Sequence, residues 1–438
     1  MEEHQAQLDF SLKRVSPHFG YATVSVPLNY VNRLYAHASL AQQSETYTHG
    51  FTKGHTPLAY IEKNFQPHLL EHIKEFFFKY FVIDWLYKEI LRNKILIAGE
   101  PRLVDIIIQP NKPALYNFSI TLAQPIPLQG WKRLPFKAPK RKNYKDLDRQ
   151  VKEFLKEEQK REKDAQPDVI GLGDWVYFAV SILDQNGNSL FSDYASHLWV
   201  KIGTEEADIP FQKLFAGKKI GESFVTNANC LQEYFSSHID THYPFRIDVL
   251  DFTPYAFFEV EQFKKHFRLR NCQELHQKLI EVFSYRNDIS QRRATSEDAL
   301  KLLLSRHTFE VPNHLVLRQQ KEILDAIYDN PDYQVYKMQG DFQEKVRKLA
   351  TKQVREAIFI HQLGCFEGIT TSTEDVKGYL NLTKRPRTKE FIYFEPPSTK
   401  YLGQELPVSA AFLEQYCLRE KTLNHAIYYL TKQKAKGL

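Results

Sequence analysis

Polar and apolar residues follow two rhythms in the first 125 residues. One-by-one alternation and short apolar runs predict strands over residues 10–12, 21–26, 103–108 and 116–123. Apolar residues spaced three or four apart predict helices that begin at Pro27 and at about Pro67, the second ending near Arg92. The pattern therefore predicts a small α+β domain over residues 1–125.

A charged stretch follows, over residues 126–167. It opens with the basic residues Lys132, Arg133, Lys137, Lys140, Arg141 and Lys142. In the mixed-charge helix expected from Leu147 to Lys163, the few apolar residues fall four apart on one narrow stripe. Such a stripe predicts a connector that docks lightly or bridges two domains.

Residues 168–253 carry strand and turn signals. Trp175 to Leu183 is a nearly continuous apolar run that leads into Asn186-Gly187, a pair typical of hairpin turns. Further strands are expected over residues 198–202 and 245–250. This segment is interpreted as a compact, mostly β domain.

Residues 254–438 are helical almost throughout. Helices are expected over 273–306, from Pro312, over 342–363 and over 410–434, with a turn at Asn330-Pro331 and a loop through Gly364 and Gly368. Ser372 and Asp375 form a plausible helix start, and residues 383–401 are expected to be irregular. The whole chain is therefore expected to be a multidomain α+β protein that ends in a long all-helical region.

Composition supports folded domains. The 438 residues suggest roughly three of them. The chain is 42% hydrophobic and 13% aromatic, which excludes wholesale disorder. A formal net charge of +6 is too weak to indicate a dedicated nucleic-acid binder.

Cysteine spacing and targeting signals bound the compartment. The four cysteines lie far apart with no C-x-x-C pair, which favours reduced thiols over a zinc site. The polar start of the chain carries no secretory h-region, and charges interrupt the Phe-rich stretch from Phe76 to Leu91. A cytosolic protein without a membrane span is expected.

The order of these parts, together with three motifs, resembles the bacterial trigger factor family over essentially the whole chain. Residues Gly50 to Pro57 read Gly-Phe-Thr-Lys-Gly-His-Thr-Pro and look like the family's ribosome-docking loop, Gly-Phe-Arg-x-Gly-Lys-x-Pro. Ile202 to Phe224, with an aromatic between glycines and a Gly-x-x-Phe strand start, is similar to the family's FKBP-type isomerase domain. Phe309 to Pro312 resembles the start of a helical arm.

The resemblance implies a division of labour along the chain. Residues 1–125 would bind the ribosome, 126–167 would link, 168–253 would be an FKBP-type prolyl isomerase-like domain, and 254–438 would hold clients. The implied partners are the large ribosomal subunit near the exit tunnel (ribosomal protein and rRNA), nascent or unfolded polypeptides, and a second copy of the chain away from the ribosome. No cofactor, metal or membrane is expected.

The implied ribosome-binding residues are Gly50, Phe51, Lys53, Gly54 and His55. A lysine can meet rRNA phosphate, and a phenylalanine can bury itself against a ribosomal protein. Taken alone, the loop is more simply interpreted as an ordinary helix-connecting turn with a solvated lysine, and only the resemblance favours the ribosome contact. Thr52 and His55 replace two basic residues of the family pattern, so we expect weaker and more salt-tolerant ribosome binding.

The resemblance places four aromatics on isomerase pocket positions: Phe191, Phe211, Tyr234 and Phe245. Such a dry aromatic cup favours the twisted amide without any acid or base. Each residue could equally be a core residue of the β domain. Departures from the family at Val180, Ser192, Asp208 and Pro210 predict weak activity, because a carboxylate at the pocket floor would wet it.

Candidate client-binding residues are the large apolar side chains of the helical region: Leu315, Leu317, Ile323, Leu324, Ile327, Tyr328, Phe359 and Ile360. Exposed apolar patches mark interaction sites, although the same residues could simply pack helix against helix.

The sequence leaves four candidate functions for the protein. The first is a nucleotide-independent holding chaperone at the ribosome, and the second is a prolyl isomerase whose helices only recruit substrate. An extracytoplasmic chaperone is disfavoured by the start of the chain. A nucleic-acid binder would rest on the basic run from Lys132 to Lys145, more simply a solvated linker. No Walker loop or dinucleotide fingerprint is apparent.

Overall fold

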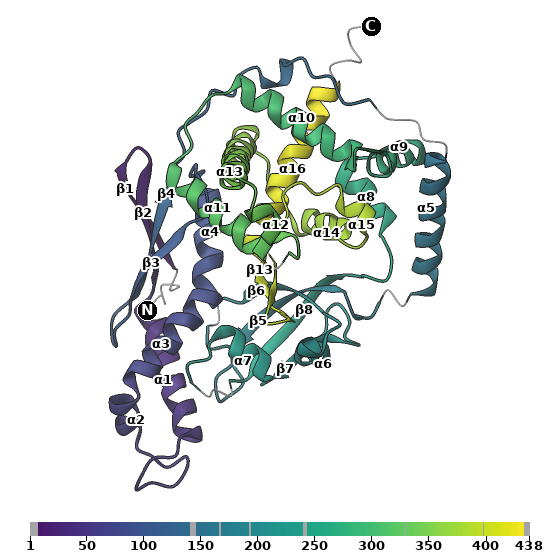
Figure 1. Ribbon diagram of the computed structural model, residues 1–438. Helices are drawn as coiled ribbons and strands as arrows, with labels where there is room; N and C mark the ends of the chain where they lie inside the picture. Colours follow the sequence, from purple (N-terminus) through teal and green to yellow (C-terminus); the bar gives the residue numbers. More distant parts are fainter. Residues whose placement is uncertain are drawn as a thin grey trace.

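The computed structural model describes residues 8–140, 146–165, 168–191, 194–239, 243–328, 330–396 and 398–432. Figure 1 shows an N-terminal head on the left, a β domain at the lower right, and a helical body above them. The protein is thus a multidomain α+β protein, which confirms the expected fold class. Within these residues, no helix is long and apolar enough to cross a membrane.

The head packs helices on one face of a four-stranded antiparallel sheet. Its strands are β1 (Asp9–Ser16), β2 (Phe19–Val26), β3 (Arg102–Ile107) and β4 (Ala114–Thr121), in the order β1-β2-β4-β3. Its helices are α1 (Leu28–Glu45), α2 (Leu58–Asn64), α3 (Gln66–Phe77) and α4 (Ile83–Arg92). Alternate residues of β4, such as Tyr116 and Phe118, are buried, as expected for a sheet with one covered face. The expected strands of this domain are confirmed.

The long helix expected from Pro67 to Arg92 is interrupted. Between α3 and α4 lies a π-helical turn, η1 (Phe78–Val82). The wider turn lets three consecutive side chains, Tyr80, Phe81 and Val82, all be fully buried. An apolar run of this kind gives no sequence signal that separates a π turn from α-helix.

The connector helix α5 (Leu147–Asp164) docks more firmly than its narrow apolar stripe predicts. Glu158, one of the many charged residues of this helix, is only 1% exposed. Its carboxylate accepts two hydrogen bonds from the Arg385 guanidinium (2.8 and 3.0 Å) and one from the backbone N–H of Phe258 (2.7 Å). This buried ion pair fixes the connector to the body. Arg141 and Lys142, part of the expected basic run, lie outside the described residues.

The β domain is built on a five-stranded sheet of order β13-β6-β5-β8-β7. Its elements are β5 (Trp175–Ile182), β6 (Ser196–Lys201), α6 (Ile209–Phe215), β7 (Ser223–Thr226), α7 (Asn229–Phe235) and β8 (Phe245–Thr253). The Asn-Gly turn is confirmed: Gly187 has φ +79°, and the Asp184 carboxylate accepts from the backbone N–H groups of Asn186 and Asn188.

One strand of this sheet comes from the far end of the chain. β13 (Val408–Ser409) pairs antiparallel with β6, through Val408 opposite Trp199 and Ser409 opposite Leu198. It covers what would otherwise be a free edge. A two-residue strand next to a helix leaves no readable alternation, so it was not foreseen.

The body consists of helices. They are α8 (Val260–Phe267), α9 (Cys272–Phe283), α10 (Gln291–Arg306), α11 (Asn313–Tyr328), α12 (Tyr333–Lys337), α13 (Phe342–Glu367), α14 (Thr373–Leu382), α15 (Pro386–Lys389) and α16 (Ala410–Lys432). The helix start at Ser372 is confirmed as a capping box with Asp375. Gly364 lies inside α13, so the expected loop begins only at Gly368, which has φ +64°.

The prediction of a single helix over residues 273–306 is wrong. A hairpin of β9 (Tyr285–Arg286) and β10 (Ile289–Ser290) separates α9 from α10. Asn287 and Asp288 form its turn with φ +50° and +59°, a conformation that these two residue types tolerate.

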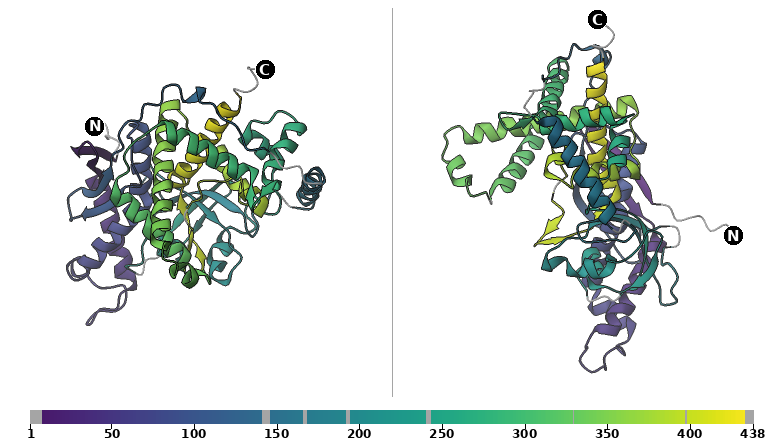
Figure 2. Two further views of the ribbon diagram at one scale, coloured as in Figure 1. Left: turned by 45° about the horizontal axis from the view of Figure 1, so that its top comes forward. Right: turned by 90° about the vertical axis from the view of Figure 1, so that its right-hand side faces the viewer.

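Helices α11 and α13 pack against each other as an antiparallel pair with α12 at their tip. The right-hand view of Figure 2 shows this pair standing out sideways from the rest of the molecule. We call α11, α12 and the first half of α13 the arm. The fold therefore presents two projections: the arm, and the loop between α1 and α2 at the bottom of Figure 1.

Candidate functional site

The docking loop, residues 46–57, joins α1 to α2. Gly50 and Gly54 have φ +89° and +81°, a left-handed backbone that favours glycine. Backbone hydrogen bonds from Phe51 N–H to Thr48 O and from His55 N–H to Thr52 O, both 3.0 Å, close two successive turns. The loop is therefore an ordered, tightly turned tip.

The charge of the loop is smaller than its sequence indicates. Lys53 pairs with Glu45 of α1 at 2.8 Å, and this carboxylate raises the lysine's pKa. His55 Nδ1 lies 3.1 Å from the carbonyl oxygen of Lys53. The lysine thus reaches solvent beside a carboxylate, a contact that the loop motif alone could not reveal because Glu45 precedes it.

Aromatic side chains lie exposed on the loop and on the neighbouring first turn of α2, beside the exposed polar residues of the loop. Tyr47 is 82% exposed, Phe51 39% and Tyr60 40%, and the rings of Phe51 and Tyr60 lie 5.7 Å apart. Leu58 is exposed as well. Of this set only Phe51 was singled out from the sequence. The tip is better suited to burying rings against a protein than to binding phosphate.

The four predicted pocket aromatics lie in the β domain, and none opens on a cavity described for this structure. Phe191, Phe211 and Phe245 are fully buried, and Tyr234 is half-buried. Phe235, which the sequence did not single out, lies 5.0 Å from the Tyr234 ring and 5.6 Å from the Phe245 ring. It joins these two, whereas Phe211 lies on α6 and Phe191 in the loop after β5. Their binding of proline stays a prediction.

The head covers this aromatic face of the β domain. Tyr80 of η1 lies 5.8 Å from Phe191 and 5.5 Å from Phe235, ring to ring. Tyr30 of α1 and Phe81 of η1 meet the other sides of Phe191, at 4.9 and 5.0 Å. One continuous hydrophobic core therefore spans the two domains. We call this contact the seam.

Polar contacts line the rim of the seam. Lys79 pairs with Glu75 (2.8 Å) and donates a hydrogen bond to the carbonyl oxygen of Tyr234. The Glu75 carboxylate lies 3.4 Å from the ring nitrogen of His238 and accepts from the backbone N–H of Ser237 (3.4 Å). Deeper in, the Tyr243 hydroxyl lies 2.9 Å from Nε2 of His72, and burial lowers the pKa of His72 to about 3.

Asp84 ties three parts of the protein together. This buried carboxylate of α4 pairs with Lys88 at 2.5 Å and accepts from the Tyr194 hydroxyl of the β domain at 3.3 Å. It also accepts from the Ser409 hydroxyl (3.1 Å) and from the backbone N–H of Ala411 (3.3 Å), at the start of α16. Head, β domain and body therefore meet at one charged group.

Asp208 does not wet a pocket, contrary to the expectation from its sequence position. Its carboxylate accepts from the backbone N–H groups of Glu205 (3.1 Å) and Glu405 (2.8 Å), so the buried charge is satisfied. Pro210 lies in the first turn of α6, where proline is tolerated. Ser192 lies outside the described residues.

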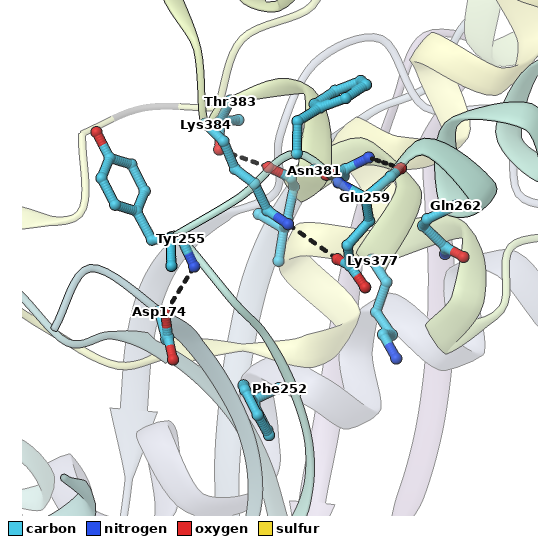
Figure 3. A network of polar contacts seen from close by, with 12 residues as sticks. Asp174, Phe252, Tyr255, Glu259, Gln262, Lys377, Asn381, Thr383 and Lys384 are labelled. Atoms are coloured by element: carbon cyan, nitrogen blue, oxygen red, sulfur yellow. Dashed lines mark hydrogen bonds and ion pairs between the residues drawn. The ribbon is translucent and has the colours of Figure 1, made fainter. Parts of the chain in front are cut away.

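A polar network joins the β domain to the body, as Figure 3 shows. Lys384 pairs with Glu259 at 2.8 Å, and burial lowers the pKa of this lysine to about 8. The Asn381 side chain accepts from the backbone N–H of Glu259 (3.0 Å) and donates to its carbonyl oxygen (2.8 Å). Asp174 accepts from the backbone N–H of Tyr255 (2.6 Å). Since these groups satisfy one another, the network acts as a structural joint.

The eight predicted client-binding residues divide by burial. Leu317 is 54% and Tyr328 67% exposed. Ile323, Leu324 and Ile327 are half-buried on α11. Phe359 and Ile360 are fully buried between helices of the body, and Leu315 is buried near the head.

For these last three, packing rather than client contact is the role that the structure assigns. The arm also exposes four residues that the sequence did not single out: Val335, Tyr336, Met338 and Leu349. Met338, at the tip, is 85% exposed.

The order of head, connector, β domain and helical arm defines a class: multidomain folding factors with an exposed loop at the head and a projecting arm. Sequence comparison identifies the family. The model "Bacterial trigger factor protein (TF)" matches residues 9–157, and "Bacterial trigger factor protein (TF) C-terminus" matches residues 271–385, together more than half of the chain. The chain belongs to the bacterial trigger factor family.

Individual relatives are distant. The trigger factor of Rickettsia canadensis is 23% identical over 372 residues, which span 82% of this chain and 80% of the relative. That of Halothermothrix orenii is 21% identical over 348 residues, 75% of this chain and 78% of the relative. A solved structure described as "Promiscuous Substrate Recognition in Folding and Assembly Activities of the Trigger Factor Chaperone" aligns with a TM-score of 0.36 and 13% identity, covering 95% of this chain and 99% of the other.

Proposed function

We propose that this protein is a nucleotide-independent chaperone that binds the large ribosomal subunit near the exit tunnel and holds nascent chains. Membership of the trigger factor family supports a ribosome-associated chaperone. The observation that carries the finer proposal is the pairing of two projections: a loop with exposed aromatic rings, and an arm with exposed apolar side chains.

The loop is the proposed ribosome contact. Its exposed rings would bury themselves against a ribosomal protein, while Lys53 would reach rRNA phosphate. Because Lys53 is paired with Glu45 and the family's two other basic positions hold Thr52 and His55, the contact is more apolar than ionic.

The arm is the proposed client-binding surface. Its exposed and half-buried residues, from Leu317 to Tyr328 on α11 and at Met338, form a surface that unfolded segments can cover. Away from the ribosome, pairing of two copies would cover the same kinds of surface.

The β domain is proposed to retain an FKBP-type prolyl isomerase activity that is weak in the intact protein. The four aromatics and the domain's place in the chain support the activity. The burial of Phe191 under the head argues for the weakness, and it also disfavours a protein whose main task is isomerisation.

Ribosome co-sedimentation tests the central claim. The variant Phe51→Ala/Lys53→Ala should lose most of its binding to ribosomes. The control Phe366→Ala/Lys301→Ala, which removes an exposed Phe and an exposed Lys elsewhere, should bind like the parent. Unchanged binding by the first variant would remove the loop from the interface.

Aggregation of a denatured, proline-free client tests the chaperone activity separately. The parent should keep it in solution equally well with and without ATP. The variant Leu317→Ser/Tyr328→Ser should do so less well, because both side chains are exposed on the arm. An equally effective variant would move the client-binding surface off α11.

A further inference from the structure

The head presents an aromatic ring to the aromatic face of the β domain. The Tyr80 side chain is fully buried and faces Phe191 and Phe235. Its hydroxyl donates a hydrogen bond of 3.1 Å to the carbonyl oxygen of Val180, in the middle of β5. A buried ring with a satisfied hydroxyl fills this space completely.

Neighbouring head residues close the remaining access. Tyr30 and Phe81 cover Phe191, and Phe76 packs at 5.1 Å on Phe235. Protein interiors are close-packed, so a proline ring and the Tyr80 ring cannot occupy the same face at once. Substrate access then requires that the head and the β domain separate at the seam.

We propose that the head is an intramolecular occupant of the β domain's aromatic face, so that the domain takes prolyl peptides only when the seam opens. This inference rests on the isomerase part of the proposed function and explains its weakness. The closed seam lowers the apparent affinity for a prolyl substrate by the fraction of open molecules.

Three features mark the seam as a contact that can open. A polar rim of Glu75, Lys79 and His238 surrounds the aromatic centre. Buried inside, Nδ1 of His72 has no hydrogen-bond partner, which costs the closed state free energy. The π turn that carries Tyr80 belongs to a class of distortion often found at functional sites.

The test measures isomerisation of an unstructured tetrapeptide with a Leu-Pro bond by the full chain. The variant Glu75→Ala/Lys79→Ala removes the rim while leaving every aromatic in place. We expect its turnover to rise about tenfold over the parent, the effect of a tenfold shift toward the open state. Hydrogen exchange of residues 74–82 should speed up in parallel.

The control is Glu261→Ala/Lys264→Ala, which removes another Glu–Lys ion pair, three residues apart on α8 (2.7 Å). It should leave turnover unchanged. A second variant, Tyr80→Ala, removes the occupying ring itself and should raise turnover at least as much, provided that its circular dichroism matches the parent.

Two outcomes would overturn the inference. One is a parent chain that already turns over the peptide as fast as either seam variant. The other is faster exchange at residues 74–82 with no gain in turnover in either variant. Ribosome co-sedimentation and suppression of aggregation report on the proposed chaperone separately, so a failure here is distinguishable from a failure of that function.

Discussion

The docking loop and the seam both carry aromatic side chains, but the loop exposes them to solvent and the seam buries them. At the loop, Tyr47 and Phe51 stand in solvent, whereas at the seam Tyr80 and Phe191 are completely buried. Tyr47, Phe51 and Tyr80 all belong to the head, whereas Phe191 belongs to the β domain that packs on it. What separates them is a second layer: the β domain covers one set, and nothing in the described chain covers the other. An aromatic motif therefore indicates a contact surface, but it does not tell whether that surface contacts another part of the same chain or another molecule.

The largest expected difference between the two regions is in stability. Phe191→Ala should lower the free energy of unfolding by about 3–5 kcal/mol, since it empties a buried site ringed by other aromatics. Phe51→Ala should change it by less than about 0.5 kcal/mol, because its ring is partly in water already. Urea unfolding of the full chain measures both, with Phe366→Ala, 52% exposed, as control. Equal shifts for Phe191 and Phe51 would contradict the burial contrast.

Acid should weaken the seam and spare the loop. The folded-state pKa of His72, about 3, lies below its ordinary value of 6.5 because burial disfavours the charged ring. The unfolded chain therefore binds the proton first. Stability is fully present above pH 6.5 and falls by up to about 1.4 kcal/mol per pH unit between 6.5 and 3.

Urea midpoints at pH 7, 6 and 5 measure this slope. His72→Gln offers a side chain that can still bond the Tyr243 hydroxyl but cannot titrate. In this variant the slope of the unfolding free energy against pH should fall by the equivalent of about one proton. The slope that remains comes from other buried histidines such as His266 and His361. An identical slope in the variant would show that His72 does not titrate in this range.

Restoring positive charge to the loop should change its binding and leave the seam untouched. Thr52→Arg/His55→Lys should tighten ribosome binding at low salt and steepen the dependence of log affinity on log salt by about 1.5 to 2. Co-sedimentation across a salt series measures this. Gln150→Arg/Gln159→Lys adds the same charges on exposed positions of α5 and should keep the parent's slope. A parental slope in the loop variant would place these positions away from phosphate.

The smallest effect is expected from Glu45→Gln. This change frees Lys53 from its 2.8 Å ion pair, which is exposed and therefore weak. Ribosome binding should tighten by less than about threefold, with a slightly steeper salt dependence. A loss of binding would mean that Glu45 itself contacts the partner.

Local sequence patterns predicted most of the secondary structure. The strands of the head, the Asn-Gly turn and the capping box at Ser372 follow from rules that involve a few neighbouring residues. The hairpin after α9 was not predicted, because Asn287 and Asp288 lie among charged residues that fit a helix surface as well as a turn. The π turn was not predicted either, because the run Phe76–Ile83 holds a single charged residue, Lys79, and so has too few polar positions to show its period.

The roles of individual residues were harder to predict, because they depend on partners far along the chain. Glu158 resembles its solvated neighbours until Arg385 is brought beside it. The isomerase aromatics were placed by resemblance, yet Phe191 is buried against Tyr80 and Tyr30 of the head, which no motif links to it. The tight turns of the loop could be predicted from Gly50 and Gly54 because their geometry is local, whereas its role as a ribosome contact stays a prediction.

The pairing of β13 with β6 has a consequence for how this protein is made. During synthesis Trp199 leaves the ribosome more than 200 residues before Val408, its partner in the sheet. Until β13 emerges, directly before the last helix α16, the sheet lacks its edge strand. The unpaired backbone groups of β6 are open to other chains during that time. A chain of the trigger factor family thus itself passes through a prolonged state in which its own sheet is incomplete.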